Sequence, residues 1–517
     1  MPINAVELHK IIEKADEYAL VDVREARVTA EQGSILLGVP IPLSVLELKV
    51  DALIPRRNTP VIVYDGGDED LAARAAARLE TLGYTDVEVL DGGLEGWAAA
   101  GYKVQTGGDH VIGQAFGEWI EEVYATPHLS VPDYLAKIEN GEDIVLLDSR
   151  PIGEFENHSL PGGTSVPGAE LVYRAAEVVK SPDSLVVVNC AGRTRSILGA
   201  QLLINAGLPN RVVSLERGTQ SWVLEGHPLD HGKHEVAPLP TGAALDAARA
   251  AADRFRARFG IRTVDQDTLR RFHDEAGERS LYVLDVRTPE EYAAGHLPGT
   301  TSAPSWDVAP WVFRYIATHH ARIVLVDNDE VRATVAASWI EQFGWGEVFV
   351  LANPLDGQEL ETGPVPTTAL DVPSDIATTT EAAGTVIDLR PSHQYRKGHI
   401  PGAAFAIRAR LTGDLPGTGP IVLVSEDGLL ARYAARDLAA LTDRPVRVLE
   451  GRPETLVEGD EIWLHEPDDV VASGWRETDP ELRKAGFRRY LSWELGLVEE
   501  LNADDTVPFR SFAEDRP

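Results

Sequence analysis

The sequence predicts an α/β protein built from four tandem domains, each a mostly parallel sheet flanked by helices. The first observation is an apolar strand pattern that ends in Asp-x-Arg and recurs four times. The second is a glycine-containing turn after each of these strands, and the third is a later apolar run, in most repeats followed by an alanine-rich helical pattern. Strands that alternate with helices at this spacing are typical of parallel βαβ units. An internal repeat of this length therefore decides the expected architecture.

The repeated elements appear in the same order in each domain. The Asp-x-Arg strand ends begin at Asp22, Asp148, Asp285 and Asp388. The turns lie at 33–38, 159–162, 295–299 and 398–402, and the second apolar runs at 61–64, 185–188, 323–326 and 421–424. Residues 71–79 are one example of the helical pattern that follows. We therefore expect domains at 1–108, 109–236, 237–364 and 365–465, and a C-terminal extension at 466–517.

The connecting segments carry weaker signals. Residues 243–255 are polar and rich in alanine, so propensity predicts a helix at the start of the third domain. Residues 113–120 are expected to pack across the first domain boundary. The extension has no repeat signature, and its aromatic residues predict that it packs on a neighbouring domain without chemistry of its own. These residues are Trp475, Phe487, Tyr490, Trp493 and Phe509.

Composition narrows the class of protein. A 517-residue chain with 44% hydrophobic residues has ample material for several packed cores. One cysteine excludes internal disulfides and multi-cysteine zinc sites. The net charge of −34 argues against nucleic acid and anionic lipid as partners. The sequence leaves an oligomer open. No signal-peptide pattern and no run of membrane-spanning length is evident, so a cytoplasmic protein is expected.

The single cysteine, Cys190, lies where chemistry is expected. It ends the apolar run of the second domain, and a short loop with Arg193 and Arg195 leads into a helical pattern. The free N–H groups of a helix start, the helix dipole and two cations all favour a thiolate over a thiol. We therefore expect Cys190 to be a nucleophile rather than a core residue.

This loop resembles the active-site loop of the rhodanese family of sulfurtransferases, which runs from a cysteine through four residues to an arginine or threonine. Cys190 to Arg195 has this length, and the surrounding motifs occur in the family's order: Asp148 with Arg150, the turn at 159–162, and Gly218 with Trp222. The resemblance implies that only the second domain is catalytic and that Cys190 carries a persulfide. The loop expected to cradle the sulfur consists of Ala191, Gly192, Arg193, Thr194, Arg195 and Ser196.

The resemblance also implies the reaction. Sulfane sulfur is expected to pass from an anionic donor through Cys190 to a thiol, cyanide or protein acceptor, with no cofactor and no metal. Thiosulfate is the default donor, with 3-mercaptopyruvate or a low-molecular-weight persulfide as alternatives. Arg193 and Arg195 are expected to neutralise the donor. Arg150 is expected to pair with Asp148 and is a candidate for a substrate contact, and Arg174 is a candidate for the pocket mouth.

The other three loops depart from the catalytic pattern. Asp65, Asp327 and Ser425 stand where the second domain has its cysteine, and acids surround them. A carboxylate cannot carry a persulfide, and a serine hydroxyl is far harder to ionise than a thiol. These domains are therefore predicted to be inactive scaffold.

Two other functions are compatible with the sequence. Phosphatases and arsenate reductases with related loops have five residues between cysteine and arginine, whereas this loop has four, and Asn189 precedes the cysteine. A sulfur carrier or scaffold that delivers sulfur to a partner protein is the second alternative. Turnover with small acceptors, compared with turnover on a partner, separates it from a free-standing enzyme.

Overall fold

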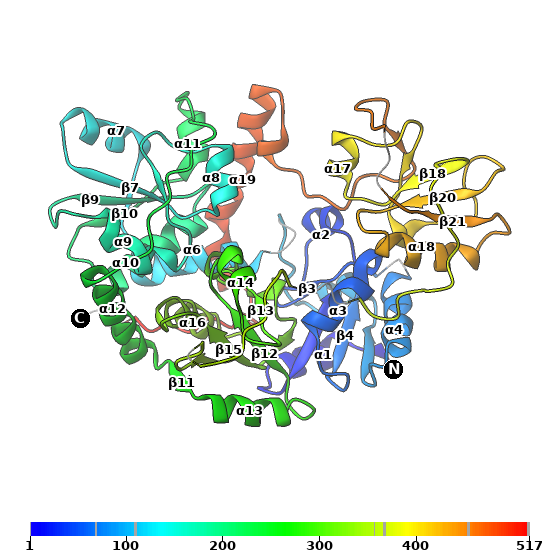
Figure 1. The fold of residues 1–517 in the computed structure, drawn as a ribbon, viewed down its shortest axis with the longest axis horizontal. Helices are drawn as coiled ribbons and strands as arrows, with labels where there is room; N and C mark the ends of the chain where they lie inside the picture. The colour runs from blue at the N-terminus through cyan, green and yellow to red at the C-terminus, as the bar shows by residue number, and fades with distance from the viewer. Residues whose placement is uncertain are drawn as a thin grey trace. The chain divides into compact units, whose positions relative to one another are not determined.

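The computed structural model describes residues 2–67, 70–107, 111–355, 357–365, 369–451 and 455–513. It contains four separate, mostly parallel sheets with helices on their faces (Figure 1), which confirms the predicted α/β class and tandem repeat. Contacts group the first and fourth sheets in one compact unit and the second and third sheets with the C-terminal helix in another. The domain boundaries remain predictions. Asp68 and Glu69 of the first loop, linker residues 108–110 and Pro366 lie outside the described residues.

The first domain has the sheet order β1-β5-β4-β2, with β3 beside β2. Its strands are β1 (Pro2–Ile3), β2 (Tyr18–Asp22), β3 (Val39–Pro40), β4 (Val61–Tyr64) and β5 (Val87–Leu90). Its helices are α1 (Ala5–Ile12), α2 (Ala26–Gln32), η1 (Leu43–Val45), α3 (Leu46–Leu53), α4 (Leu71–Thr81) and α5 (Gly93–Ala99). Helix α4 confirms the helical pattern at 71–79.

The second domain has the order β6-β10-β9-β7-β8. Its strands are β6 (His128–Leu129), β7 (Ile144–Asp148), β8 (Thr164–Ser165), β9 (Leu185–Asn189) and β10 (Val212–Leu215). Its helices are α6 (Ile112–Tyr124), α7 (Val131–Glu139), α8 (Ile152–Asn157), α9 (Glu170–Val178), α10 (Thr194–Asn205) and α11 (Gly218–Leu224). Strand β9 is buried at every position, as expected for a β-branched run inside a parallel sheet.

Apolar side chains cover both faces of this second sheet. On one face, α7 and α11 pack Tyr134 and Trp222 against β9 and β10. On the other face, α9 and α10 pack Leu171 and Leu203. Figure 1 shows the two helix layers on opposite sides of β7, β9 and β10. The sheet is therefore a rigid platform, and the loop after β9 leaves it at the carboxyl edge.

The third domain has the order β11-β16-β15-β12-β13. Its strands are β11 (Arg262–Val264), β12 (Leu281–Asp285), β13 (Thr301–Ser302), β15 (Arg322–Val326) and β16 (Glu347–Leu351), and β14 (Thr318–His319) is a further short strand. Its helices are α12 (Ala243–Phe259), α13 (Gln266–Asp274), α14 (Pro289–Ala294), α15 (Ser305–Val308), η2 (Val312–Arg314) and α16 (Val331–Phe343).

Two helices join the second and third domains. The predicted helix at 243–255 is confirmed as α12, and its Ala248 and Ala252 pack with Tyr173 of α9 and Val331 of α16. Small alanine side chains allow this close packing. Residues 113–120 lie in α6, whose buried Phe116 contacts the rings of Trp339 and Phe343 in α16. The ring contacts of Phe116 are thus made with the third domain, whereas the sequence predicts packing of residues 113–120 across the boundary between the first and second domains.

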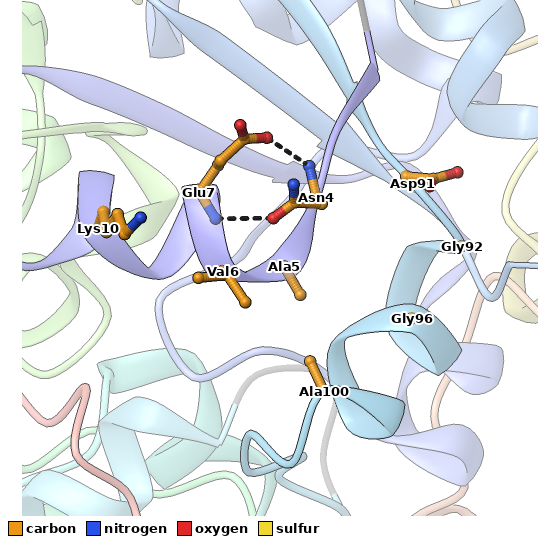
Figure 2. A pocket seen from close by; sticks show the side chains of 9 residues that line it. All are labelled: Asn4, Ala5, Val6, Glu7, Lys10, Asp91, Gly92, Gly96 and Ala100. Atoms are coloured by element: carbon orange, nitrogen blue, oxygen red, sulfur yellow. Dashed lines mark hydrogen bonds between the residues drawn. The ribbon is translucent and has the colours of Figure 1, made fainter.

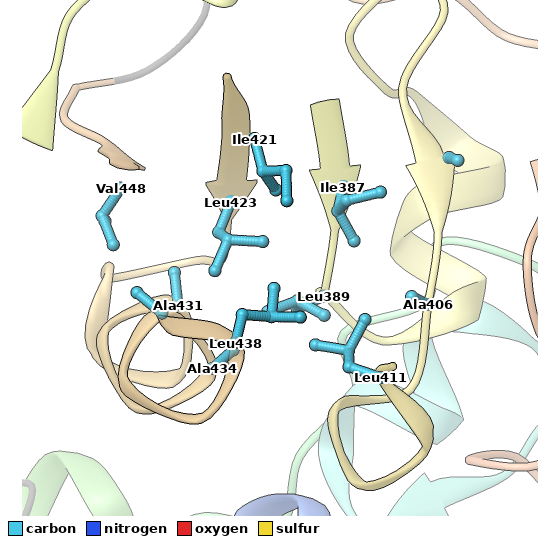
Figure 3. Close-up of a cluster of buried hydrophobic side chains, with 12 residues drawn as sticks. Ile387, Leu389, Ala406, Leu411, Ile421, Leu423, Ala431, Ala434, Leu438 and Val448 are labelled. Carbon is cyan, nitrogen blue, oxygen red and sulfur yellow. The ribbon is translucent and has the colours of Figure 1, made fainter. Parts of the chain in front are cut away.

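The fourth domain repeats the order as β17-β21-β20-β18-β19, with β22 added beside β19. Its strands are β17 (Thr378–Thr379), β18 (Thr385–Asp388), β19 (Ala404–Phe405), β20 (Ile421–Val424), β21 (Val446–Leu449) and β22 (Ile462–Trp463). Its helices are α17 (Ser392–Lys397), η3 (Arg408–Arg410) and α18 (Leu429–Ala439). Figure 3 shows the core on one face of this sheet, where Ile387, Leu423 and Leu438 meet.

The extension forms η4 (Gly474–Arg476) and the long helix α19 (Pro480–Asn502). Asp479 caps α19 by accepting hydrogen bonds from the N–H groups of Glu481 and Leu482. Helix α19 packs against α6 and α11 of the second domain, which agrees with the expected packing of the extension. Within the described ranges, no helix has the length and apolar character needed to span a membrane.

Candidate active site

Cys190 directly follows β9, at the carboxyl edge of the second sheet, and α10 begins four residues later. Its side chain is 1% exposed. The thiol donates to the Ser196 hydroxyl at 3.4 Å, which in turn donates to the Arg193 carbonyl at 2.9 Å. The backbone N–H of Ser196 also bonds to the sulfur. Ser196, in the first turn of α10, therefore contacts Sγ with both its hydroxyl and its N–H group.

The backbone of α11 holds the loop from the other side. The Thr219 N–H donates to the Cys190 carbonyl at 2.9 Å, and the Gln220 N–H donates to the Ala191 carbonyl at 3.0 Å. Gly218 makes this approach possible, because its φ is +49° and a Cβ there would lie 2.2 Å from the Cys190 carbonyl oxygen. The Gly-x-x-x-Trp motif of the sequence thus supports the cysteine loop directly.

Arg193 does not point a free charge at the sulfur, contrary to the sequence-based expectation. Its Nε and Nη2 donate to both carboxylate oxygens of Glu118 on α6, at 2.7 and 2.8 Å, and Nη2 also contacts Glu121. The Arg193 side chain is buried. Burial raises the pKa of Glu118, although the Arg193 charge acts against this shift. Arg193 therefore fastens the loop to α6, an element that lies about 70 residues away in sequence and gave no sign of this pairing.

Arg195 also has a carboxylate partner, but its charge does act on the cysteine. Its Nη1 and Nη2 donate to Glu154 of α8 at 2.7 and 2.9 Å, and its guanidinium lies 5.5 Å from the ring centre of Trp311. Burial raises the pKa of Cys190, and the Arg195 charge acts against this shift. Of the two arginines, Arg195 is thus the one placed to stabilise a thiolate.

The pKa of the Cys190 thiol is shifted upward, whereas the loop sequence predicts a downward shift. Burial raises the pKa of the Cys190 thiol, and this outweighs the Arg195 charge and the hydrogen bonds to Ser196 that lower it. The loop sequence showed the cations but not the elements that exclude water from the sulfur. In this closed arrangement Cys190 is a protonated thiol at neutral pH.

Helix α19 is one of the elements that cover the loop. A Cβ at Gly192 would lie 3.1 Å from Tyr490 Cε1 and 3.2 Å from Glu494 Oε2. Gly192 therefore provides room for α19, and its φ is outside the left-handed region. Trp475, just before α19, stacks on His158 of the second domain with ring centres 4.1 Å apart.

Glu494 is the site residue that sequence reasoning missed. The carboxyl group is fully buried, and its Oε1 accepts hydrogen bonds from the hydroxyls of Thr194 at 3.1 Å and Tyr490 at 3.0 Å. Burial raises the pKa of Glu494 to about 8. The extension has no repeat signature, so only its cluster of aromatic residues indicated a buried helix, and nothing in the sequence linked it to the cysteine loop.

Two further candidates are engaged in structural contacts. Arg150 is fully buried; it pairs with Asp148 at 2.8 Å and donates to the His158 carbonyl at 2.7 Å. Arg174 pairs with Glu170 and donates to the Ala237 carbonyl at 2.6 Å. The expected Asp148–Arg150 pair is present, whereas neither guanidinium is left available for the expected substrate contact, because each is used to tie segments of the domain together.

The cysteine-free loops fill the corresponding position with their own acceptors. Asp65 accepts from the N–H groups of Gly67 and Ala72, both at 2.9 Å. Asp327 accepts from the Glu330 N–H at 2.6 Å and the Ala333 N–H at 3.1 Å. Ser425 accepts from the Ala431 N–H at 3.2 Å. Each side chain occupies the helix-start donors that would face a persulfide, which agrees with the predicted inactivity.

A separate concave region lies in the first domain (Figure 2). It is an open pocket of about 570 Å³ between the start of α1 and the segment around Asp91. Asn4 and Glu7 cap α1 reciprocally, with N–H to oxygen distances of 3.1 and 3.0 Å. The polar groups of Asn4 and Glu7 in this pocket are therefore already used by the helix cap.

Comparison with known proteins agrees with this geometry. The family profile of the rhodanese-like domain matches residues 4–100, 131–225 and 266–357. A crystal structure of a thiosulfate sulfurtransferase from Pseudomonas aeruginosa has a TM-score of 0.92 and 39% identity, and the match covers 98% of this chain and 99% of that one. The chain therefore belongs to the rhodanese family. Because the similarity at 39% identity extends over nearly its whole length, it is an enzyme of the sulfurtransferase class.

Curated relatives match shorter parts of the chain. The putative thiosulfate sulfurtransferase SseB of Mycobacterium tuberculosis is 30% identical over 129 residues, which cover 23% of this chain and 43% of that protein. The putative sulfur carrier protein YrkF of Bacillus subtilis is 26% identical over 141 residues, which cover 25% of this chain and 72% of that protein. The chain thus spans less than half of the length of SseB.

Proposed function

We propose that this protein transfers sulfane sulfur from an anionic donor such as thiosulfate to a thiol or cyanide acceptor through a Cys190 persulfide. The observation that carries the proposal is the placement of Cys190 in the loop that leads from β9 into α10, with the N–H and hydroxyl of Ser196 at its sulfur. Successive N–H groups at a helix start form an anion-binding nest. Such a nest suits the terminal sulfur of a persulfide. The loop from Ala191 to Ser196 would supply it.

The reaction has two displacement steps. In the first, the Cys190 thiolate attacks the outer sulfur of thiosulfate. A new S–S bond forms to Sγ, the donor's S–S bond breaks, and sulfite leaves with the electron pair. In the second, an acceptor thiolate or cyanide attacks the outer sulfur of the persulfide, and Cys190 leaves as a thiolate. Arg195 favours the thiolate at both ends of the cycle.

The burial of Cys190 adds a requirement to this mechanism. Cys190 is only 1% exposed. Its sulfur must therefore become accessible before the thiolate can attack the donor and before the acceptor can attack the persulfide. Because α19 lies against Gly192, movement of α19 is the opening that the structure favours. Donor binding and release are thus expected to depend on local opening rather than on chemistry alone.

The test uses the only thiol of the chain. Intact mass spectrometry after thiosulfate treatment should show one added sulfur, and cyanide should remove it. Cys190→Ser should abolish both the mass gain and thiosulfate:cyanide turnover while the circular dichroism spectrum stays unchanged. Near wild-type turnover by Cys190→Ser would contradict the proposal.

A sulfur carrier that delivers to a partner protein is the second candidate, and the similarity to YrkF favours considering it. In that case Cys190 should accept one sulfur as above, but small acceptors should discharge it slowly. Rapid discharge by cyanide and by small thiols in multiple-turnover assays would favour the free-standing enzyme.

A further inference from the structure

We propose that Glu494 of α19 is a catalytic residue that binds the anionic sulfur donor, donating a hydrogen bond from its protonated carboxyl to a donor oxygen. The inference rests on the proposed sulfur transfer at Cys190 and assigns to the extension a role that its sequence did not suggest. It is carried by the position of the carboxyl group over the cysteine loop and by one unpartnered oxygen.

The two carboxyl oxygens of Glu494 have different surroundings. Oε1 accepts from two hydroxyl groups, those of Thr194 and Tyr490. Oε2 is buried and has no hydrogen-bond partner among the described residues. A proton on Oε2 is therefore a buried hydrogen-bond donor without an acceptor. Such a donor costs free energy unless a bound ligand supplies the acceptor. The oxyanion of a donor such as thiosulfate is an acceptor of this kind.

Oε2 points at the tip of the cysteine loop. It lies 3.2 Å from the position that a Cβ at Gly192 would take, and Gln220 Nε2 lies 3.7 Å from the same position. The Glu494 carboxyl group and the Gln220 amide N–H group thus both lie beside Gly192, two residues from Cys190, and both can donate a hydrogen bond to a small anion.

The charged and titratable groups around Glu494 favour its neutral form. Burial is the main cause, and the Glu118 carboxylate on α6 adds to it. The Arg193 charge and the hydroxyls of Tyr490 and Thr194 act in the opposite direction but do not outweigh burial. Because Arg193 is already paired with Glu118 and Glu121, little positive charge remains to hold Glu494 ionised.

The chemistry follows from the protonation state. The neutral acid donates to the donor's oxygen and keeps that bond while the S–S bond breaks and sulfite departs, so the proton stays on Glu494. The carboxylate has no proton to donate and repels an anion at close range. Binding of an anionic donor should therefore decline as the pH rises through the pKa of about 8 of Glu494, whereas attack on a neutral reagent should not.

The experiment compares two reagents at Cys190. The measured quantity is kcat/KM for thiosulfate divided by the rate constant for alkylation by iodoacetamide, from pH 6.5 to pH 9.5. Both reagents need an accessible thiolate, so accessibility and Cys190 ionisation cancel in the ratio. In the wild type the ratio should fall about tenfold between neutral pH and one unit above the Glu494 pKa, following the loss of the acid form.

Glu494→Gln keeps a neutral donor and should give a ratio that changes less than about twofold over this range. Glu494→Ala should give a low ratio at every pH, and Glu499→Gln on the exposed face of α19 should behave like the wild type. A flat wild-type ratio, or a Glu494→Gln ratio that still falls, overturns the assignment of Glu494. No sulfur transfer by a wild type that is alkylated normally overturns the proposed function, and the Glu494 role with it.

Discussion

At the scale of single residues, the cysteine loop is stabilised by charge pairs rather than lined with free charge. Both loop arginines are bidentate to glutamates, and the two pairs differ in their relation to the sulfur. Arg193 is buried against α6, whereas the Arg195 charge acts on Cys190 and its partner Glu154 is partly exposed. A donor can therefore compete with Glu154 for Arg195 far more easily than with Glu118 for Arg193.

Alanine variants of the two arginines should separate these roles. Arg195→Ala should lower kcat/KM for thiosulfate by about ten- to a hundredfold and move alkylation of Cys190 to higher pH, because one charge-assisted contact and one nearby cation are lost. Arg195→Lys keeps the positive charge, so the pH dependence of Cys190 alkylation should return close to that of the wild type. The kcat/KM for thiosulfate should recover less, because lysine lacks the planar guanidinium that can donate two parallel hydrogen bonds.

Arg193→Ala should instead destabilise the second domain by roughly 3 kcal/mol, because Glu118 stays buried without its partner. Reactivity toward iodoacetamide and thiosulfate should then change by the same factor. Thermal melting and the two rate constants measure these effects. A selective loss of the thiosulfate reaction in Arg193→Ala, with normal melting, would assign the donor contact to Arg193 instead.

At the scale of elements, the site depends on the contact of α19 with the second domain. Phe487 anchors the start of this helix: it is 1% exposed, and its ring centre lies 4.5 Å from that of Trp475. Trp475 in turn stacks on His158. Burial, followed by the nearby Arg150 charge, lowers the pKa of His158 to about 4, so this ring is neutral and suited to stacking near physiological pH.

Loosening α19 should expose Cys190. Phe487→Ala removes a buried aromatic ring, a change that typically costs about 3–5 kcal/mol, and part of this cost should appear as easier local opening. Alkylation of Cys190 should accelerate by about tenfold or more. Leu495→Ala, at a position of the same helix that is 47% exposed, is the matched control and should react like the wild type. An unchanged alkylation rate in a Phe487→Ala protein that melts earlier would mean that the thiol is reached without opening of α19.

At the scale of the whole molecule, one reactive domain is accompanied by three whose loops are closed by their own side chains. The first and fourth domains are joined by a buried charge pair, in which Arg408 donates to both oxygens of Glu47 at 2.7 and 2.9 Å. Such pairs favour a fixed arrangement more than they add stability. The net charge of −34 is distributed over these domains and is screened beyond about 8 Å at physiological ionic strength, so local groups decide donor binding.

Substitutions in the three closed loops should therefore leave catalysis intact. Asp65→Ala, Asp327→Ala and Ser425→Ala should each keep turnover per Cys190 within about twofold of the wild type, because none of these residues reacts. Asp65→Ala and Asp327→Ala should lower the melting temperature, since two backbone N–H groups lose their acceptor in each case. Reduced kcat in a variant that melts normally would show that a closed loop takes part in the reaction or in its gating.

The sequence alone determined the parts of this protein that depend on local pattern. Apolar β-branched runs, glycine turns and alanine-rich helices recur along the chain, so the α/β class, the repeat and the position of Cys190 at a strand end could be predicted. Parallel sheets place such loops at one edge regardless of context, and that is why the loop from Cys190 to Arg195 could be recognised.

The tertiary structure decided which charges act on Cys190 and which groups are shielded from water. Arg193 meets Glu118 and Thr194 meets Glu494 across about 75 and 300 residues of chain, and no local pattern encodes contacts at such separations. Burial raises the pKa of both Cys190 and Glu494. Desolvation depends on every element packed around a group, so the protonation state of the site follows from the fold and not from the loop sequence.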